Sequence, residues 1–198
     1  MYEDFKTFGK DLFDQEMISS HGGNMSIRVG DRILITRRGS MLGHLTDEDI
    51  IETGLWKDDS GITLASTETP VHRAIYQNTP ALAVVHAHPV HTVVLSMECN
   101  ELIPIDSEGS YLLHKVPVIA SEYTAGSKEV ARLASEALKE YKIVALRGHG
   151  IFATGQLLEE AYQWASALEV SARMILLARS AGVNVKAYRT SSDKYTKW

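Results

Sequence analysis

Short apolar segments that predict strands alternate with amphipathic segments that predict helices along this chain of 198 residues. The expected strands lie at 25–29, 32–36, 81–88, 115–120, 143–146 and 151–154, with one more near the turns at 46–49 and 58–61. The expected helices lie at 1–17, 67–78, 93–97, 129–141 and 156–180. Because these elements interleave without a linker, the sequence predicts one three-layer α/β domain, a central mostly antiparallel sheet flanked by helices.

We expect residues 1–198 to form this single domain. Residues 183–198 differ from the rest, because they are polar yet include Tyr188, Tyr195 and Trp198. A polar tail with aromatic residues is unusual for full exposure to solvent, so this segment is a candidate contact with a neighbouring subunit.

Composition excludes several classes of protein. The 20 Lys and Arg against 25 Asp and Glu give a net charge of −5, which argues against binding to nucleic acid. The lone Cys99 cannot form an internal disulfide, no basic and apolar leader opens the chain, and no apolar run approaches the length of a membrane span. We therefore expect a cytoplasmic protein without a membrane anchor.

The run Val84-Val85-His86-Ala87-His88-Pro89 is the most informative for function. On a strand, residues i and i+2 face the same side, so His86 and His88 can present two imidazoles together. This arrangement suits a metal ion. The alternative is a pair of ordinary polar residues, so a third ligand is needed.

His149 is the best candidate for that third ligand, since it lies in the tight turn Arg147-Gly148-His149-Gly150 after a buried strand. Three neutral imidazoles leave a position open on Zn²⁺, as catalytic sites require. A turn histidine bonded only to backbone is the alternative. Glu68, at the start of the helix after Ser66-Thr67, is a fourth candidate, or else a simple acid of the first turn.

Three segments are suited to binding an anion. Gly22-Gly23-Asn24 offers backbone N–H groups and an amide. Ser66 and Thr67 offer hydroxyls beside a helix start. Arg37, Arg38 and Gly39 form the third segment.

Five segments together resemble the class II aldolase/adducin family in order and spacing. They are His21–Arg28, Leu34–Gly39, Ser66–Glu68, His86–Pro89 and Arg147–Gly150. The resemblance covers roughly Phe5 to Ala181. It implies that His86, His88 and His149 bind zinc, that Glu68 is the acid/base carboxylate, and that Asn24, Gly39, Ser66 and Thr67 hold a substrate phosphate. It also implies a homotetramer with active sites at subunit interfaces, where Tyr188 or Tyr195 could complete a neighbouring site.

The chain departs from the family pattern at three places. Arg38 replaces a small hydroxyl residue, and the glycine-rich turn begins with His21 rather than threonine. Arg38 is therefore included among the phosphate-binding candidates, although an arginine would bind the carboxylate of a substrate equally well.

The third departure is at the position of a family tyrosine that helps proton transfer. Asp106, Glu108 or Tyr111 could act there instead, or the segment is an acidic turn. His72, one helical turn after Glu68, is either a partner of the site or structural.

The resemblance implies a zinc-dependent aldolase that cleaves a ketose 1-phosphate, of the L-fuculose 1-phosphate type, to dihydroxyacetone phosphate and an aldehyde such as L-lactaldehyde. A pentulose-phosphate epimerase, a dehydratase or a decarboxylase could use the same zinc site. Epimerases of this family tend to have Asp at the position of Glu68, which argues against that alternative. A non-catalytic interaction module of the adducin kind is a further alternative, but such a module would not need the three histidines and Glu68.

Overall fold

The computed structural model describes residues 1–122 and 126–184. In this part of the chain the strands form a sheet in the order β3-β2-β1-β4-β8-β7-β6-β5, and neighbouring strands are antiparallel except for β6 and β7. The strands are β1 (Asn24–Val29), β2 (Arg32–Thr36), β3 (Ile50–Gly54), β4 (Ala83–Ala87), β5 (Glu101–Leu102), β6 (Val116–Ile119), β7 (Ile143–Leu146) and β8 (Gly150–Gly155). The expected mostly antiparallel sheet is confirmed.

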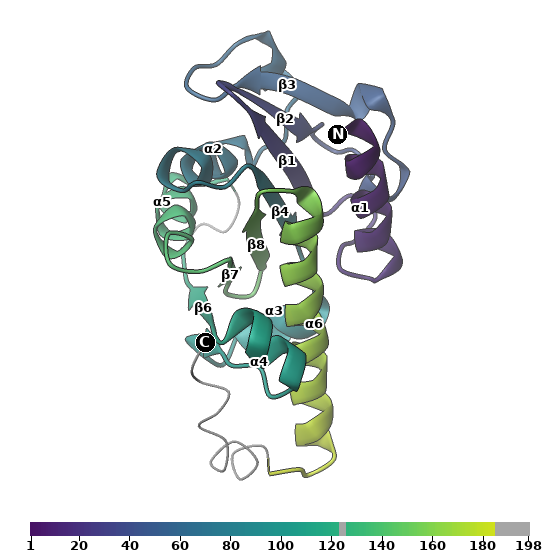
Figure 1. Ribbon diagram of the computed structural model, residues 1–198, viewed down its shortest axis with the longest axis vertical. Helices are drawn as coiled ribbons and strands as arrows, with labels where there is room; N and C mark the ends of the chain where they lie inside the picture. The colour runs from purple at the N-terminus through teal and green to yellow at the C-terminus, as the bar shows by residue number, and fades with distance from the viewer. Residues whose placement is uncertain (123–125, 185–198) are drawn as a thin grey trace.

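Helices cover both faces of this sheet, with α1 and α6 on one side and α2 and α5 on the other (Figure 1). The helices are α1 (Tyr2–Asp14), α2 (Thr69–Asn78), α3 (Val90–Ser96), α4 (Ser107–Leu113), α5 (Lys128–Ala137) and α6 (Leu158–Ser180). Short 3₁₀ turns are η1 (Leu42–His44), η2 (Asp47–Asp49) and η3 (Ser60–Thr63). The three layers agree with the architecture expected from the sequence.

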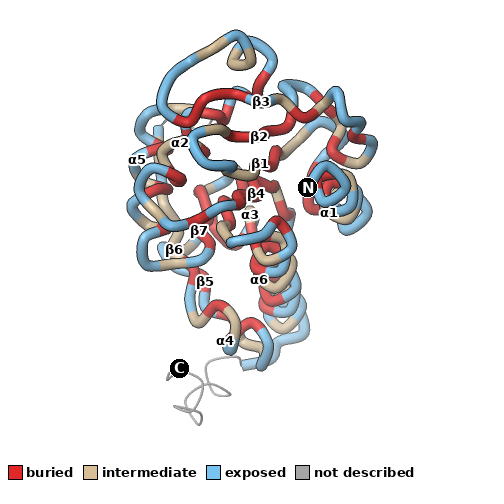
Figure 2. The backbone as a smooth tube through the Cα atoms, turned by 45° about the horizontal axis from the view of Figure 1, so that its top comes forward, coloured by how far each residue is buried: buried red, intermediate tan, exposed pale blue. Residues whose placement is uncertain are grey.

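The strand β4 is buried on both of its faces, and Figure 2 shows it in red between the two helical layers. Ala83, Val85 and Ala87 belong to the core shared with α1 and α6. Val84 belongs to the second core, formed with α2 and α5. Because alternate residues face the same side, His86 lies on the α2 side of the sheet with Val84.

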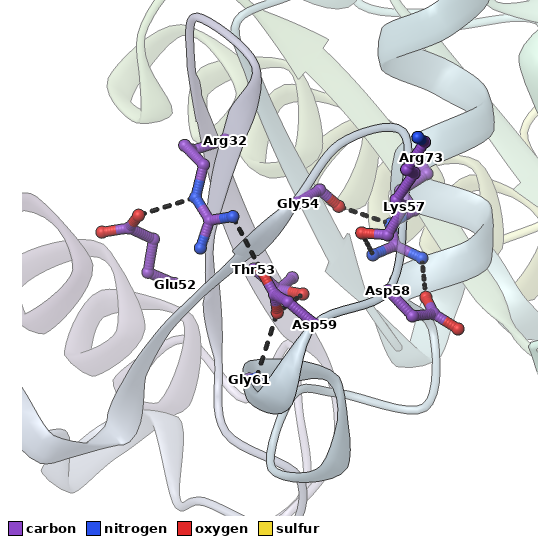
Figure 3. Close-up of polar contacts among 9 residues, drawn as sticks. All are labelled: Arg32, Glu52, Thr53, Gly54, Lys57, Asp58, Asp59, Gly61 and Arg73. Atoms are coloured by element: carbon purple, nitrogen blue, oxygen red, sulfur yellow. Dashed lines mark hydrogen bonds and ion pairs between the residues drawn. The ribbon is translucent and has the colours of Figure 1, made fainter.

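The connection between β3 and α2 is held by two arginines (Figure 3). Arg32 bonds to the carboxylate of Asp59, which also accepts from the Thr53 hydroxyl. Arg73, on α2, bonds to Asp58 and to the Gly54 carbonyl. Each exposed ion pair adds little stability alone. Together they fix the path of the segment that leads into residues 66–68.

Two elements were not expected from the sequence. The segment expected to be a loop or acidic turn contains α4, which Asp106 caps and which packs against α6. The two-residue strand β5 pairs with β6. Tertiary contacts stabilise both, and seven and two residues are too short to give a periodic signal.

In the described residues no helix is both long enough and apolar enough to cross a bilayer. The tail expected to contact a neighbouring subunit is 183–198, and its residues from 185 onward, with Tyr188 and Tyr195, lie outside the described residues.

Candidate active site

Two of the three candidate metal ligands lie at one end of β4. His86, the fourth residue of the strand, is 1% exposed, and His88 follows directly after the strand ends. Their ring centroids are 4.8 Å apart, and their Nε2 atoms are 3.0 Å apart. The two imidazoles therefore face each other, as the i and i+2 positions predict.

The third candidate, His149, comes from the turn between β7 and β8. Because β8 pairs with both β4 and β7, this turn lies beside the end of β4. The His149 ring centroid is 5.0 Å from that of His86 and 4.8 Å from that of His88. One nitrogen from each ring lies within 4.8 Å of the other two. The structure thus brings together three histidines that the sequence separates widely.

Glycines make room for these rings. A Cβ on Gly150 would lie 2.3 Å from the Ala87 carbonyl oxygen and 2.7 Å from Cδ2 of His88. A Cβ on Gly22 would lie 3.0 Å from Nδ1 of the same ring. Gly150, after β7, and Gly22, before β1, are therefore required for close approach of the backbone to His88.

Backbone and aromatic contacts fix the orientation of His86. Its Nδ1–H donates to the Ile151 carbonyl oxygen at 2.9 Å, so Nε2 carries the lone pair. The ring also stacks on Phe152, with centroids 4.2 Å apart. A histidine whose Nδ1–H is held by a carbonyl presents Nε2 to a metal ion.

The site favours neutral imidazoles. Burial lowers the pKa of His86 well below its usual value, and the neighbouring histidines lower it further. Burial, with a smaller effect of His149, lowers the pKa of His88 to about 4. Neutral imidazole is the form that coordinates a cation.

Glu68 lies at the N-cap position of α2 and its side chain is buried. Its Oε1 accepts a hydrogen bond from the Gly126 N–H at 2.9 Å, whereas Oε2 is buried without a hydrogen-bond partner among the described residues. Burial raises the pKa of this carboxyl to about 6, and the bond from Gly126 offsets part of the shift. A carboxyl with such a pKa can accept or release a proton near neutral pH.

These residues fit a divalent metal ion. Three converging imidazoles form a donor set suited to Zn²⁺, and a zinc ion with three protein ligands keeps one coordination position for water or substrate. A buried carboxylate oxygen without a partner, such as Oε2 of Glu68, is costly unless a cation, a proton or a ligand compensates it.

The anion-binding candidates lie on neighbouring segments. Asn24, the first residue of β1, is buried and lies opposite His86 in the sheet. The Met25 N–H donates to the Thr36 hydroxyl, so the start of β1 adjoins the end of β2. The Ser66 N–H in turn donates to the Thr36 carbonyl, which places the segment before α2 beside the same strand end.

Exposure differs among these candidates. Ser66 is buried and its hydroxyl accepts from the Glu68 N–H, whereas Thr67 is exposed. Arg38 is exposed as well, and its backbone N–H donates to the Leu64 carbonyl. Gly39 has φ of +69° with open space where a Cβ would stand. The predicted residues thus lie on adjoining strand and helix ends, where Arg38 and Gly39 are exposed to solvent.

Comparison with known proteins identifies the family. The sequence model described as Class II Aldolase and Adducin N-terminal domain matches residues 3–176. This chain belongs to the class II aldolase and adducin family. It is 31% identical to the L-fuculose phosphate aldolase of Methanocaldococcus jannaschii over 169 residues, which cover 84% of this chain and 90% of that protein.

Solved structures agree with this assignment. The crystal structure of L-fuculose-1-phosphate aldolase from Thermus thermophilus superposes with a TM-score of 0.87 and 40% identity, over 91% of this chain and 95% of that one. A Klebsiella pneumoniae structure, YgbL, described as a putative aldolase/epimerase/decarboxylase, gives 0.82 and 25%, over 95% and 97%. The chain is thus a class II aldolase, an aldehyde-lyase class that uses a divalent metal ion.

Two contacts of this class II aldolase could not be read from its sequence. Gly126, expected only to precede a helix, donates its N–H to Glu68 across 58 positions of sequence. The side chain of His72 is fully buried and bonds to Asn24 and Ser26, across more than forty positions of sequence. Neither contact has a local sequence signal, because both partners come from elements that meet only in the folded chain.

The structure also gives Asp106 a structural role. Its Oδ2 accepts from the Gly109 N–H at 2.7 Å as the cap of α4, and its Oδ1 accepts from the Ser171 hydroxyl at 2.6 Å. One carboxylate oxygen therefore caps α4, and the other bonds this helix start to α6. Glu108 and Tyr111 lie exposed on the same short helix.

Proposed function

We propose that this class II aldolase cleaves a ketose 1-phosphate, of the L-fuculose 1-phosphate type, to dihydroxyacetone phosphate and an aldehyde such as L-lactaldehyde, with Zn²⁺ as the metal ion. The observation that carries the proposal is the convergence of three imidazoles in a chain that also buries Glu68, one oxygen of which has no partner among the described residues. The names of its relatives support the substrate class.

His86, His88 and His149 would hold the metal ion through their ring nitrogens. The ion would supply Lewis-acid stabilisation of the negative charge that develops on substrate oxygens when the C3–C4 bond breaks. The Ile151 carbonyl keeps His86 in the tautomer required for this role.

Glu68 would transfer the proton at carbon. In the cleavage direction the C4 hydroxyl loses its proton to a base, for which Glu108 and Tyr111 are the candidates, as the C3–C4 bond breaks and the aldehyde forms. The protonated carboxyl of Glu68 then delivers a proton to C3, the carbon that keeps the electron pair of that bond. In the synthetic direction its carboxylate removes that proton from dihydroxyacetone phosphate. The raised pKa of about 6 places both charge states within reach near neutral pH.

Asn24, Arg38, Gly39, Ser66 and Thr67 would bind the phosphate group. Amide, hydroxyl and backbone donors, with the guanidinium of Arg38 at the exposed side, suit a doubly charged anion. Holding the phosphate fixes the reacting carbons relative to Glu68, and such positioning can remove several kcal/mol of the barrier.

Glu68→Gln separates the proton step from metal binding. We expect the variant to retain zinc, because its histidines are unchanged, and to lose exchange of the C3 proton of dihydroxyacetone phosphate with solvent deuterium by at least about 100-fold. Metal content and proton NMR measure the two properties. Normal exchange in Glu68→Gln would remove Glu68 from this role.

A product screen tests the reaction itself. The zinc-loaded enzyme is incubated with several ketose 1-phosphates, and dihydroxyacetone phosphate is measured with a coupled dehydrogenase. If no ketose 1-phosphate releases dihydroxyacetone phosphate and a sugar phosphate is epimerised or dehydrated instead, the enzyme is an epimerase or a dehydratase. Failure of carefully prepared protein to bind any divalent ion would favour an adducin-like interaction module.

We also propose that residues 1–198 act as one domain within a homotetramer. Two rows of exposed apolar residues at helical spacing support an assembly surface. They are Val90, Val94 and Met97 at α3, and Val170, Met174 and Leu177 on α6. Val90 and Val170 line one shallow cavity, so the two rows meet there.

A further inference from the structure

Four buried polar side chains form a continuous series of hydrogen bonds between β1 and α2. The Tyr76 hydroxyl bonds to the Ser26 hydroxyl, Ser26 bonds to Nδ1 of His72, and Nε2 of His72 bonds to Oδ1 of Asn24, each at 2.6 Å. Asn24 is 6% exposed, and the other three are at most 1% exposed. We call these four residues the buried relay.

The hydrogen bonds of the relay run in one direction. Oδ1 of Asn24 can only accept, so His72 donates its Nε2–H to it. Burial lowers the pKa of His72 to about 3, so the ring is neutral and its Nδ1 accepts from the Ser26 hydroxyl. Because the Ser26 hydroxyl hydrogen points to His72, its oxygen accepts from the Tyr76 hydroxyl.

The bond from His72 also fixes how the Asn24 amide is turned. Its Oδ1 atom faces His72, so Nδ2 with its two N–H groups takes no part in the relay. Asn24 pairs with His86 in the sheet, near the end of β4 that carries two of the candidate metal ligands. The amide donors are thus left for a group outside the relay at this end of the sheet.

We propose that His72 is a positioning residue that holds Asn24 with its amide N–H groups turned toward the substrate phosphate. This inference rests on the phosphate-binding role given to Asn24 in the proposed function. Without the bond from His72, the amide can rotate and present its oxygen to the anion, which would repel the phosphate.

A core-filling role alone does not explain the relay. Replacing hydrogen-bonded buried groups with apolar side chains of similar size is often neutral for stability. Position 72 contacts Phe152 edge-on, with centroids 6.1 Å apart, so a phenylalanine there would keep an aromatic contact. The arrangement instead places a single donor on Asn24.

The test compares His72→Phe with His72→Gln in the zinc-loaded enzyme. Gln can keep a donor toward Asn24 and an acceptor toward Ser26, whereas Phe keeps only the ring. We expect the dissociation constant for inorganic phosphate, measured by calorimetry, to rise about 10-fold to 100-fold in His72→Phe. His72→Gln should stay within about 3-fold of the wild type. Zinc content should be unchanged in both, which controls for Phe152, since Phe152 also stacks on His86.

A double-mutant cycle with Asn24→Ala makes the test specific. If His72 acts through Asn24, then His72→Phe adds no loss of phosphate affinity in the Asn24→Ala background. Additive losses, or wild-type phosphate affinity in His72→Phe, would overturn the proposal. Wild-type affinity in Asn24→Ala would overturn it as well, because Asn24 would then not bind phosphate.

A second readout separates this inference from the proposed reaction. Nitrogen-15 NMR should find His72 in the Nε2–H tautomer, and Ser26→Ala should abolish that preference. In steady-state assays of His72→Phe, KM should rise more than kcat falls. The two proposals can fail separately. If His72→Phe weakens phosphate binding only when Asn24 is present, but no ketose releases dihydroxyacetone phosphate, the proposed reaction is wrong and the positioning role of His72 stands.

Discussion

At the scale of single residues, burial acts in opposite directions on the two kinds of titratable group in the site. It lowers the pKa of His86 and His88, which keeps these rings neutral, and it raises the pKa of Glu68 to about 6. Its carboxylate has one backbone donor and one oxygen without a described partner. Such a residue costs stability when charged, and this cost can be measured.

Glu68→Gln should change the pH dependence of stability in the metal-free protein. The pKa of Glu68 is about 6 in the folded state and about 4.5 in the unfolded state. The contribution of Glu68 to the stability of the folded protein is therefore present at low pH and is lost as the pH rises through these values. We expect the stability of the variant relative to wild type to increase by about 2 kcal/mol between about pH 4 and about pH 8. Urea unfolding measures it. The exposed Glu140→Gln is the control, and equal pH profiles for the two variants would contradict the assignment.

Gly150→Ala should disturb the metal centre through contact alone. The added methyl would collide with the Ala87 carbonyl and the His88 ring, at a cost of about 1 to 3 kcal/mol in unfolding free energy. We also expect weaker zinc binding, measured by competition with a chelating dye. Gly30→Ala is the control, since its φ of +59° gives strain without a nearby atom. Loss of zinc affinity in the control would argue against a local effect.

At the scale of elements, the sheet brings the site together from strand ends and turns. The expected strands and the long helices could be predicted because their apolar periodicity is local. The pair at His86 and His88 followed from strand geometry, and His149 from its glycine turn. By contrast, α4, β5 and the bond between His72 and Asn24 depend on tertiary partners, which no local pattern encodes.

Asp106→Ala tests the structural role of α4. The variant loses the helix cap and the bond from Ser171, so we expect unfolding free energy to fall by about 1 to 2 kcal/mol. Aldolase turnover under native conditions should stay within about 2-fold of the wild type. Thermal unfolding and a steady-state assay measure the two effects. A large loss of kcat with unchanged stability would return Asp106 to the candidate proton donors.

At the scale of the whole molecule, the exposed apolar rows at α3 and α6 lie next to the histidine strand. Helix α3 begins directly after Pro89, and Glu169 of α6 accepts hydrogen bonds from the N–H groups of His91 and Thr92. The surface proposed for assembly is thus joined, through Pro89 and the hydrogen bonds of Glu169, to the segment that carries His86 and His88.

Val94→Asp combined with Met174→Asp should weaken assembly. Both side chains are more than 40% exposed in the isolated chain, so the changes should cost little stability in a monomer. A charge buried in an apolar interface would be costly, and we expect a smaller mass by light scattering. Val29→Asp, at the tip of the first hairpin, is the control. An unchanged mass in the double variant would place the interface elsewhere.

The position of the three histidines has a consequence for how long the folded protein lasts. They come from points more than sixty residues apart, at the end of a central strand and on a distant turn. An ion shared among them would act as a reversible cross-link between early and late parts of the chain. If that ion is zinc, the concentration of free zinc would shift the unfolding equilibrium by mass action. A low zinc concentration would then increase the unfolded fraction of the enzyme and shorten its lifetime, in addition to lowering its activity.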